Sequence, residues 1–268
     1  MRWLSFYING RSTPAAVAAD GSIVDLAEGA CLAGETAPAD LLEVIQRPQD
    51  RERLQRLVDF APSQARRGRA EIQLAPPLSR PGKLLCLAGN YREHIVESGF
   101  AAVAEQDVIT PQLFLKPATC LIGDDAEVAL SPANVRVGWE AELAVVIGRT
   151  ARDVRPEAAM DHVFGYTILN DLSERALNAR LEGRRLRERD PFFDWLAGKW
   201  FDGFAPCGPW IVTADEITDP HALGIRLRVN GELRQQGSTA DMIFDVPAVI
   251  AAASAIMTLE PGDIIATG

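Results

Sequence analysis

The sequence has little cysteine or histidine and no long apolar run, and these shortages exclude several classes of protein. Its four cysteines, Cys31, Cys86, Cys120 and Cys207, lie far apart and form no Cys-x-x-Cys pair. This spacing favours reduced, buried thiols over a zinc site or a disulfide framework, so a bound metal would use oxygen or imidazole ligands. No apolar stretch approaches the ~20 residues that span a bilayer, and the one at the start is too short for a signal peptide. We therefore expect a cytoplasmic protein with no membrane partner.

Positive charge and phosphate-binding glycine loops are also scarce. Lys and Arg number 27 against 37 Asp and Glu, which gives a formal net charge of -10. Such a chain repels polyanions, so we expect no nucleic-acid partner. No Gly-x-Gly-x-x-Gly occurs, which disfavours a nucleotide-dependent oxidoreductase. What remains, 47% hydrophobic and 24% charged residues over 268 positions, is typical of a globular chain with a buried core.

The first part of the chain alternates short strands and short helices. Strand-length runs at 5–8, 15–18 and 22–25 are separated by turn dipeptides, and apolar residues at helical spacing between 40 and 60 are interrupted by Pro48. Three prolines and a glycine within 75–82 indicate a linker. The sequence thus predicts a small N-terminal α/β domain over 1–77 and a second, catalytic domain over 78–268.

The second part is rich in strands. Buried-looking runs of strand length occur at 83–88, 113–115, 143–147 and 163–169, and Asn230-Gly231 predicts a hairpin between 225–229 and 232–235. Helices are predicted at 171–186 and 246–257. Because no regular βαβ alternation is present, we expect an α+β fold with a mixed or antiparallel sheet.

Three acidic residues are candidates for a metal site. Glu140 and Glu142 open an apolar strand and, two residues apart, share one face of it. Two carboxylates there are costly unless they are solvated at the strand end or neutralised by a hard cation. Asp171 follows a buried run, where it could join them or could cap a helix together with Glu174. Three acids together would form an oxygen site suited to Mg²⁺ or Mn²⁺.

A possible base and two lysines complete the candidates that the residues themselves suggest. His94 and Glu97 are three apart, so on a helix the carboxylate would orient the imidazole and raise its basicity, as a water-activating base requires. The alternative is a surface pair of little energetic weight. Lys116 and Lys199 interrupt apolar or aromatic surroundings and could hold a carboxylate or enolate oxygen, or could simply extend to solvent.

Taken as a set, these motifs resemble the fumarylacetoacetate hydrolase family from about Lys83 to the end of the sequence. The matching segments are 89–94, 113–117, 139–148, 165–175, 198–200, 229–232, 238–244 and 260–268. The family pattern continues past Thr267 and Gly268 into a Thr-Pro-x-Gly-Val-Gly loop. The resemblance therefore implies that the sequence given lacks the last strands of the domain and a second threonine of the site.

The resemblance also implies a fold, a ligand set and an assembly. The fold would be a mixed β-sandwich roll of the fumarylacetoacetate hydrolase C-terminal type behind a small N-terminal domain, usually in a homodimer. Mg²⁺ or Mn²⁺ would be bound by the three acids, and a small 2-oxo acid would be the substrate. The implied residues are Glu140, Glu142 and Asp171 for the metal, His94, Glu97 and Lys199 for catalysis, and Lys116, Arg175, Asn90, Tyr91 and Thr267 for substrate binding.

The reaction that the resemblance favours is hydrolysis of a C–C bond in an acylpyruvate-type 2,4-dioxo acid, giving pyruvate and a carboxylic acid. The same metal-polarised 2-oxo group also serves oxaloacetate decarboxylation, isomerisation of a hydroxy-dienedioate, or hydration of an enoate. A catalytically silent binding module is the alternative from another class. It is disfavoured because the metal acids and the base are all present.

Overall fold

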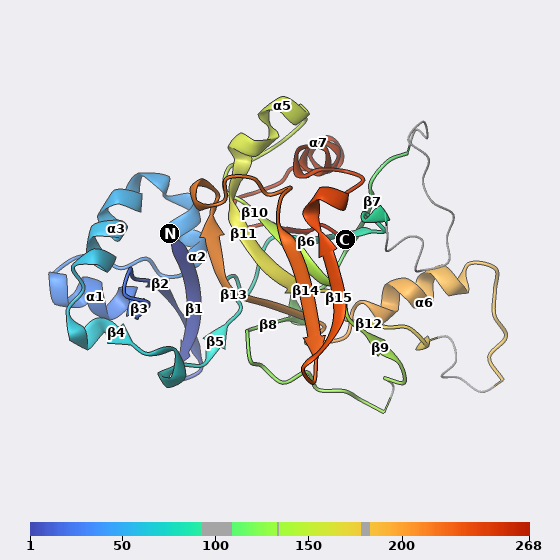
Figure 1. Cartoon of the computed structure of the whole chain (residues 1–268), viewed down its shortest axis with the longest axis horizontal. Helices are drawn as coiled ribbons and strands as arrows, with labels where there is room; N and C mark the ends of the chain where they lie inside the picture. Colours follow the sequence, from blue (N-terminus) through green and yellow to red (C-terminus); the bar gives the residue numbers. More distant parts are fainter. Residues whose placement is uncertain (93–108, 133, 178–182) are drawn as a thin grey trace.

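One large mixed sheet forms the framework of the molecule (Figure 1). The structure is a computed structural model that describes residues 1–92, 109–132, 134–177 and 183–268. At the N-terminal end β1 (Arg2–Ile8) and β2 (Arg11–Val17) pair along their whole length. The turn between them places Asn9 and Gly10 at φ of 50° and 75°, which explains why an Asn-Gly pair was a reliable hairpin signal. β3 (Ile23–Asp25) pairs with β2, as the sequence predicts.

Three helices lie beside these first strands. α2 (Leu41–Gln46) and α3 (Arg51–Asp59) are separated by a 3-10 turn that begins at Pro48, so the prediction of two short helices is confirmed. α1 (Leu26–Ala33) was not anticipated. It begins where the side chain of Asp25 accepts hydrogen bonds from two backbone N–H groups of the first turn, and it ends at Gly34, which has a φ of 69°.

The rest of the sheet carries the chemistry-bearing residues. Its order from the N-terminal strands onward is β1, β13, β11, β10, β16, β6 and β7. All these pairs are antiparallel except β16 with β6, so the expected α+β fold with a mixed sheet is confirmed. The bounds are β6 (Leu84–Ala88), β7 (Gln112–Leu115), β10 (Ala141–Ile147), β11 (Val163–Asn170), β13 (Ala205–Thr213) and β16 (Ile264–Ala266).

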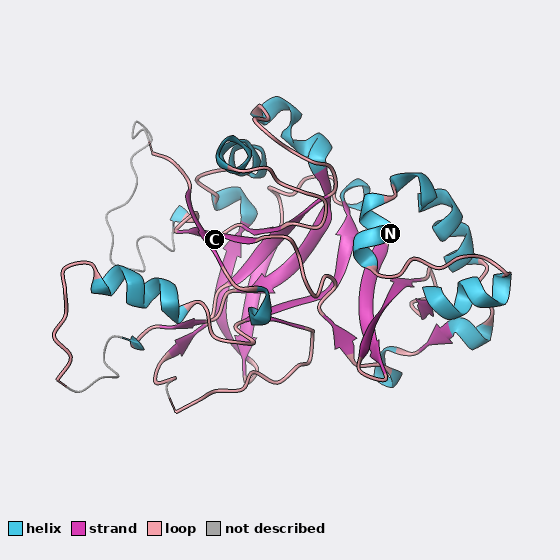
Figure 2. Cartoon of the chain, turned by 180° about the vertical axis from the view of Figure 1, so that it is seen from behind, coloured by secondary structure: helices cyan, strands magenta, loops and turns pink. Residues whose placement is uncertain are grey.

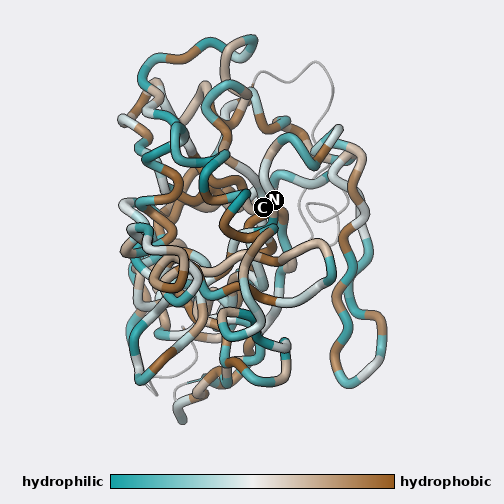
Figure 3. The backbone as a smooth tube through the Cα atoms, turned by 90° about the vertical axis from the view of Figure 1, so that its left-hand side faces the viewer, coloured by the Kyte–Doolittle hydropathy of each residue, from teal (hydrophilic) through white to brown (hydrophobic). Residues whose placement is uncertain are grey.

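β10 is enclosed along its whole length, because all seven of its residues are buried. On one side α7 (Val246–Ile256) packs its apolar face against a cluster that includes Val145 and Ile147 of β10. The hairpin of β14 (Gly224–Val229) and β15 (Glu232–Ser238) lies beside the start of β10, and α5 (Pro156–Ala159) contacts α7. Figure 2 shows the helices outside the strands, and Figure 3 shows hydrophobic segments gathered toward the middle of the molecule.

The prediction of a helix over 171–186 is wrong for the described part of that range. β12 (Ser173–Glu174) pairs there with β9 (Val137–Gly138), and the helix, α6 (Asp190–Gly198), begins later. The buried carboxylate of Glu174 accepts hydrogen bonds from the backbone N–H groups of Val135, Arg136 and Ala176 instead of capping a helix. Tertiary hydrogen bonds thus override the local capping signal.

Three short strands complete the sheet: β4 (Arg66–Arg67), β5 (Leu74–Ala75) and β8 (Leu121–Ile122). β5 pairs with β1, and β1 in turn pairs with β13, so hydrogen bonding is continuous between the two predicted domains. The boundary between 1–77 and 78–268 stays a prediction. Among the described residues, no helix combines the length and the apolarity needed to cross a membrane.

Candidate functional site

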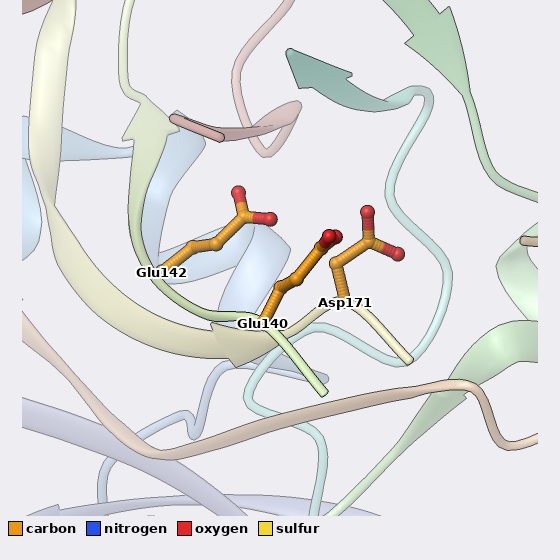
Figure 4. A group of neighbouring side chains, drawn as sticks. All are labelled: Glu140, Glu142 and Asp171. Atoms are coloured by element: carbon orange, nitrogen blue, oxygen red, sulfur yellow. The ribbon is translucent and has the colours of Figure 1, made fainter. Parts of the chain in front are cut away.

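Three carboxylates from two adjacent strands meet at one end of the sheet. Glu140 immediately precedes β10, Glu142 is the second residue of β10, and Asp171 directly follows β11. The antiparallel register pairs Ala141 with Asn170, which brings the start of one strand beside the end of the other. One carboxylate oxygen from each acid lies within 4.8 Å of the other two, and Figure 4 shows the three groups gathered on the same side of the strands.

The carboxyl group of Glu142 is buried beside two other acids. Glu142 is 2% exposed; its Oε2 accepts a hydrogen bond from the backbone N–H of Gly268 at 2.6 Å, whereas its buried Oε1 has no hydrogen-bond partner within the described part of the chain. Burial, together with the charges of Asp171 and Glu140, raises the pKa of Glu142 well above its usual range. A buried oxygen without a partner among clustered acids fits a hard divalent cation, which would supply the missing contact.

Two buried lysines neutralise part of this charge. Lys199 Nζ donates to Glu140 Oε2 and to Asp171 Oδ2, both at 2.6 Å. Lys116 Nζ donates to Asp171 Oδ1 at 2.5 Å and to the carbonyl oxygen of Leu172 at 3.1 Å. Each lysine is 3% exposed, so neither ammonium group extends to solvent. The alternative of solvent-seeking lysines therefore does not describe either residue.

Lys199 owes its position to helix α6 and its charge to the acids. It follows the last residue of α6, and its ammonium group also lies 5.3 Å and 5.8 Å from the ring centres of Phe114 and Trp195. Burial lowers the pKa of Lys199, but the carboxylates of Asp171 and Glu140 outweigh burial and raise this pKa above its ordinary value. Lys199 is thus placed as a cation and hydrogen-bond donor between the two carboxylates.

Arg175 adds a third positive group at the edge of the site. Its guanidinium pairs with Glu140 Oε1, and its side chain is partly exposed. Lys199 and Arg175 therefore contact different oxygens of the same carboxylate. The three acids and the three cations form one compact network with which a small anion could exchange contacts.

Asn90, Tyr91 and Thr267 lie together on the Glu142 side of the site. Thr267 Oγ1 donates to the carbonyl of Leu143 at 2.9 Å and lies 3.2 Å from the Tyr91 hydroxyl. The amide of Asn90 donates to the carbonyl oxygens of Thr267 and Phe244 and accepts from the N–H of Phe244. Asn90 thus holds two chain segments together. Burial raises the pKa of Tyr91 to about 12, so its hydroxyl stays a neutral donor.

His94 and Glu97 lie outside the described residues. Their assignment as a water-activating pair stays a prediction.

The sequence interpretation missed two residues beside the acids. Cys86 on β6 is fully buried, and burial with the nearby charges of Asp171 and Glu142 raises the pKa of its thiol well above the ordinary value. Asn170, the last residue of β11, accepts a hydrogen bond from the backbone N–H of Glu140 at 3.0 Å. No local signal could have found Cys86, because only the pairing of β6 with β16 and β7 brings it near the acids.

Comparison with known proteins identifies the family. Residues 83–268 match the fumarylacetoacetate (FAA) hydrolase C-terminal family, and the chain belongs to this family. The resemblance that the sequence motifs show to this family is therefore confirmed.

Among relatives, the chain is 41% identical over 200 residues to the mitochondrial oxaloacetate tautomerase fahd2 of Xenopus laevis, covering 75% of this chain and 58% of that protein. The chain thus spans less than two thirds of that relative. Among solved structures it resembles maleylpyruvate hydrolase of Sphingobium sp. SYK-6 in complex with manganese(II) and pyruvate, with 35% identity and a TM-score of 0.73 over 100% of this chain and 88% of that one. It also resembles 2-hydroxyhepta-2,4-diene-1,7-dioate isomerase of Mycobacterium marinum, with 30% identity and a TM-score of 0.69 over 100% and 86% of the two chains.

Proposed function

We propose that the protein is a Mg²⁺- or Mn²⁺-dependent hydrolase that cleaves a C–C bond of an acylpyruvate-type 2,4-dioxo acid. The products are pyruvate and a carboxylic acid. The observation that carries the proposal is that one carboxylate oxygen from each of Glu140, Glu142 and Asp171 lies within 4.8 Å of the other two, beside three cationic side chains. The manganese and pyruvate in the maleylpyruvate hydrolase structure support this choice of ligands.

The three acids would hold the metal ion. The fit rests on Glu142, whose buried Oε1 has no hydrogen-bond partner among the described residues and whose pKa is raised by burial and by the charges of Asp171 and Glu140. When bound, a divalent ion polarises the 2-oxo group of a substrate and stabilises negative charge that develops there.

The chain's own cations would hold and orient the substrate. Lys199 stays protonated and can donate to a substrate oxygen, and Arg175, partly exposed at the edge of the site, suits a terminal carboxylate. In the hydrolysis, a water oxygen bonds to C4 and the C3–C4 bond breaks. Its electron pair stays on C3, which then takes up a proton to give pyruvate. The family resemblance assigns the activation of that water to His94 and Glu97.

Tautomerisation of oxaloacetate is a second candidate, favoured by the 41% identity to the Xenopus laevis enzyme. It needs the same polarised 2-oxo group but only proton transfer between C3 and the oxygen of that group, with no C–C cleavage. Decarboxylation, isomerisation of a dienedioate and hydration use the same polarisation. The isomerase structure supports keeping a dienedioate among the substrates to be tested.

One assay separates these reactions. The protein is incubated with Mn²⁺ and a panel of acylpyruvates, oxaloacetate and a hydroxy-dienedioate, and pyruvate release and loss of enol absorbance are followed together. Pyruvate release from an acylpyruvate supports hydrolysis, whereas a change of enol absorbance in oxaloacetate without pyruvate supports tautomerisation.

Glu140→Ala and Asp171→Ala should abolish either activity, and His94→Ala should remove hydrolysis while Mn²⁺ still binds. Full turnover by either acid variant in EDTA would exclude the metal role.

A further inference from the structure

The side chain of Gln235, on the hairpin strand β15, forms two hydrogen bonds with the backbone of Ala141, the residue between the two glutamates. Gln235 Oε1 accepts a hydrogen bond from the Ala141 N–H at 2.8 Å, and Gln235 Nε2 donates to the Ala141 carbonyl, also at 2.8 Å. The side-chain amide of Gln235 thus bonds both the N–H and the carbonyl of Ala141. In a sheet, a residue of a neighbouring antiparallel strand would form this pair of hydrogen bonds with its backbone.

This contact lies on the side of β10 that faces away from β11, on which no strand of the described structure pairs with Ala141. Along β10, Glu140 directs its carbonyl toward β11, where it accepts from the Asp171 N–H at 2.8 Å, so the N–H and carbonyl of Ala141 face the opposite side. On that opposite side β16 pairs only with residues Ala144–Val146, and Thr267 reaches the carbonyl of Leu143. Gln235 continues the hydrogen bonding by one step, to Ala141.

The peptide units that Gln235 fixes are the two that carry the acids. The N–H of Ala141 belongs to the peptide that begins at Glu140, and its carbonyl belongs to the peptide that leads into Glu142. Asn170 fixes the other flank by accepting from the Glu140 N–H. A rotation of either Ala141 peptide would turn at least one glutamate away from Asp171, so a restraint on Ala141 helps to keep the acids within the 4.8 Å cluster.

The hairpin is built to present this side chain. Its register shifts between Leu227 and Arg228, which pair with Gln235 and Leu233, so Arg234 is the extra residue of a bulge immediately before Gln235. Bulges redirect the side chains beside them. Gln235 is partly buried, whereas its neighbour Gln236 is exposed.

The geometry points to Gln235 as a positioning residue for the metal site: it sets the directions of Glu140 and Glu142 through the backbone of Ala141, without contacting the metal itself. The inference rests on the proposed metal role of the three acids. It also gives the β14–β15 hairpin a role in the chemistry, since this side chain links the hairpin to the backbone at the start of β10.

The test measures metal binding directly. Isothermal titration with Mn²⁺ should show affinity weakened about 10-fold or more in Gln235→Ala and in Gln235→Met, which keeps much of the length but neither hydrogen bond. Gln236→Ala, on the adjacent exposed position, should bind as the wild type does. If Gln235 only holds the hairpin against β10, its variants should melt at a lower temperature while their dissociation constant for Mn²⁺ stays within twofold of the wild-type value. That result would overturn the inference.

Two further measurements keep the outcomes apart. Hydrogen exchange on the wild-type protein should show a protected Ala141 amide, and an unprotected one would overturn the inference even if no Gln235 variant folds. Glu142→Gln serves as the test of the site itself. If it binds Mn²⁺ like the wild type, the metal site is wrong; if it loses Mn²⁺ while both Gln235 variants keep it, only the positioning role is wrong.

Discussion

Glu142 holds its proton more tightly in the folded chain than in the unfolded chain, because burial and two neighbouring acids raise its pKa. Above about pH 4.3 the unfolded state loses this proton first, so the folded state binds more protons and its stability falls as pH rises. Glu142→Gln removes this titration. In EDTA, the variant should therefore melt at a higher temperature than the wild type, and the difference in melting temperature should grow between pH 5 and pH 8.

Differential scanning fluorimetry across that pH range checks this expectation. Glu157→Gln, an exposed change on α5, is the matched control and should follow the wild-type profile. Wild-type and Glu142→Gln curves that run parallel across the range would contradict the assignment. Because Mn²⁺ binding must displace the same proton, wild-type affinity for Mn²⁺ should rise with pH.

Lys199 is the cation that bridges two of the acids, and its removal should leave them uncompensated. Lys199→Met breaks 2.6 Å contacts to Glu140 and Asp171, so we expect the metal-free protein to lose about 3 kcal/mol of unfolding free energy. Added Mn²⁺ should raise the melting temperature of the variant by more than that of the wild type, because the ion replaces the lost positive charge.

Thermal melts with and without Mn²⁺ measure both effects. The control is Lys83→Met, which deprives the buried Asp263 of a 2.8 Å partner outside the site. It should destabilise the protein and show no extra response to Mn²⁺. Equal Mn²⁺ shifts in Lys199→Met and Lys83→Met would contradict the bridging role.

At the scale of elements, Lys199 is placed by the contact of α6 with β12. A Cβ on Gly198 would collide with the backbone carbonyl oxygen of Glu174, so the last turn of α6 depends on glycine there. Alanine favours a helix by about 1 kcal/mol, but the collision should outweigh this preference and destabilise the protein by a net ~1–2 kcal/mol. The displaced helix end should also lower turnover by moving Lys199.

Gly198→Ala is compared with Gly224→Ala, whose added Cβ meets no atom within 4 Å and whose backbone is not left-handed. Melting temperature and kcat/KM on the substrate found by the panel are measured for both. Gly224→Ala should stay within about 0.5 kcal/mol of the wild type. Unchanged turnover in Gly198→Ala would show that Lys199 is placed independently of this contact.

The elements also show where sequence reasoning succeeded and where it stopped. Turn dipeptides such as Asn9-Gly10 and apolar runs such as β10 are local signals, and the structure contains the strands and hairpins they predict. The region after Asp171 was misread, because Glu174 forms its hydrogen bonds with backbone groups near residue 135. Acids two apart on a strand could be recognised directly, but Gln235 is almost a hundred residues from Ala141, so no spacing rule reveals it.

At the scale of the whole molecule, α6 presents apolar side chains to solvent beside the site. Phe192 and Phe193 are 58% and 56% exposed and contact each other, and near the end of α6 the Trp200 indole donates to the carbonyl oxygen of Leu115, whose side chain is also exposed. Single exposed apolar residues are ordinary, whereas adjacent ones suggest a surface that another chain covers. We propose that this surface contributes to a homodimer.

Light scattering coupled to size exclusion should then give a mass of about twice the 29.1 kDa of one chain. Placing charge on the covered surface with Phe192→Glu and Phe193→Glu should shift the protein toward one chain per particle, because burying four carboxylates in a symmetric interface is costly. Phe60→Glu is the matched control: Phe60 is 83% exposed and directly follows α3, a helix at the end of the molecule opposite α6 (Figure 1). A wild-type mass near 29 kDa would contradict the dimer, and a doubled mass that survives the α6 substitutions would place the interface elsewhere.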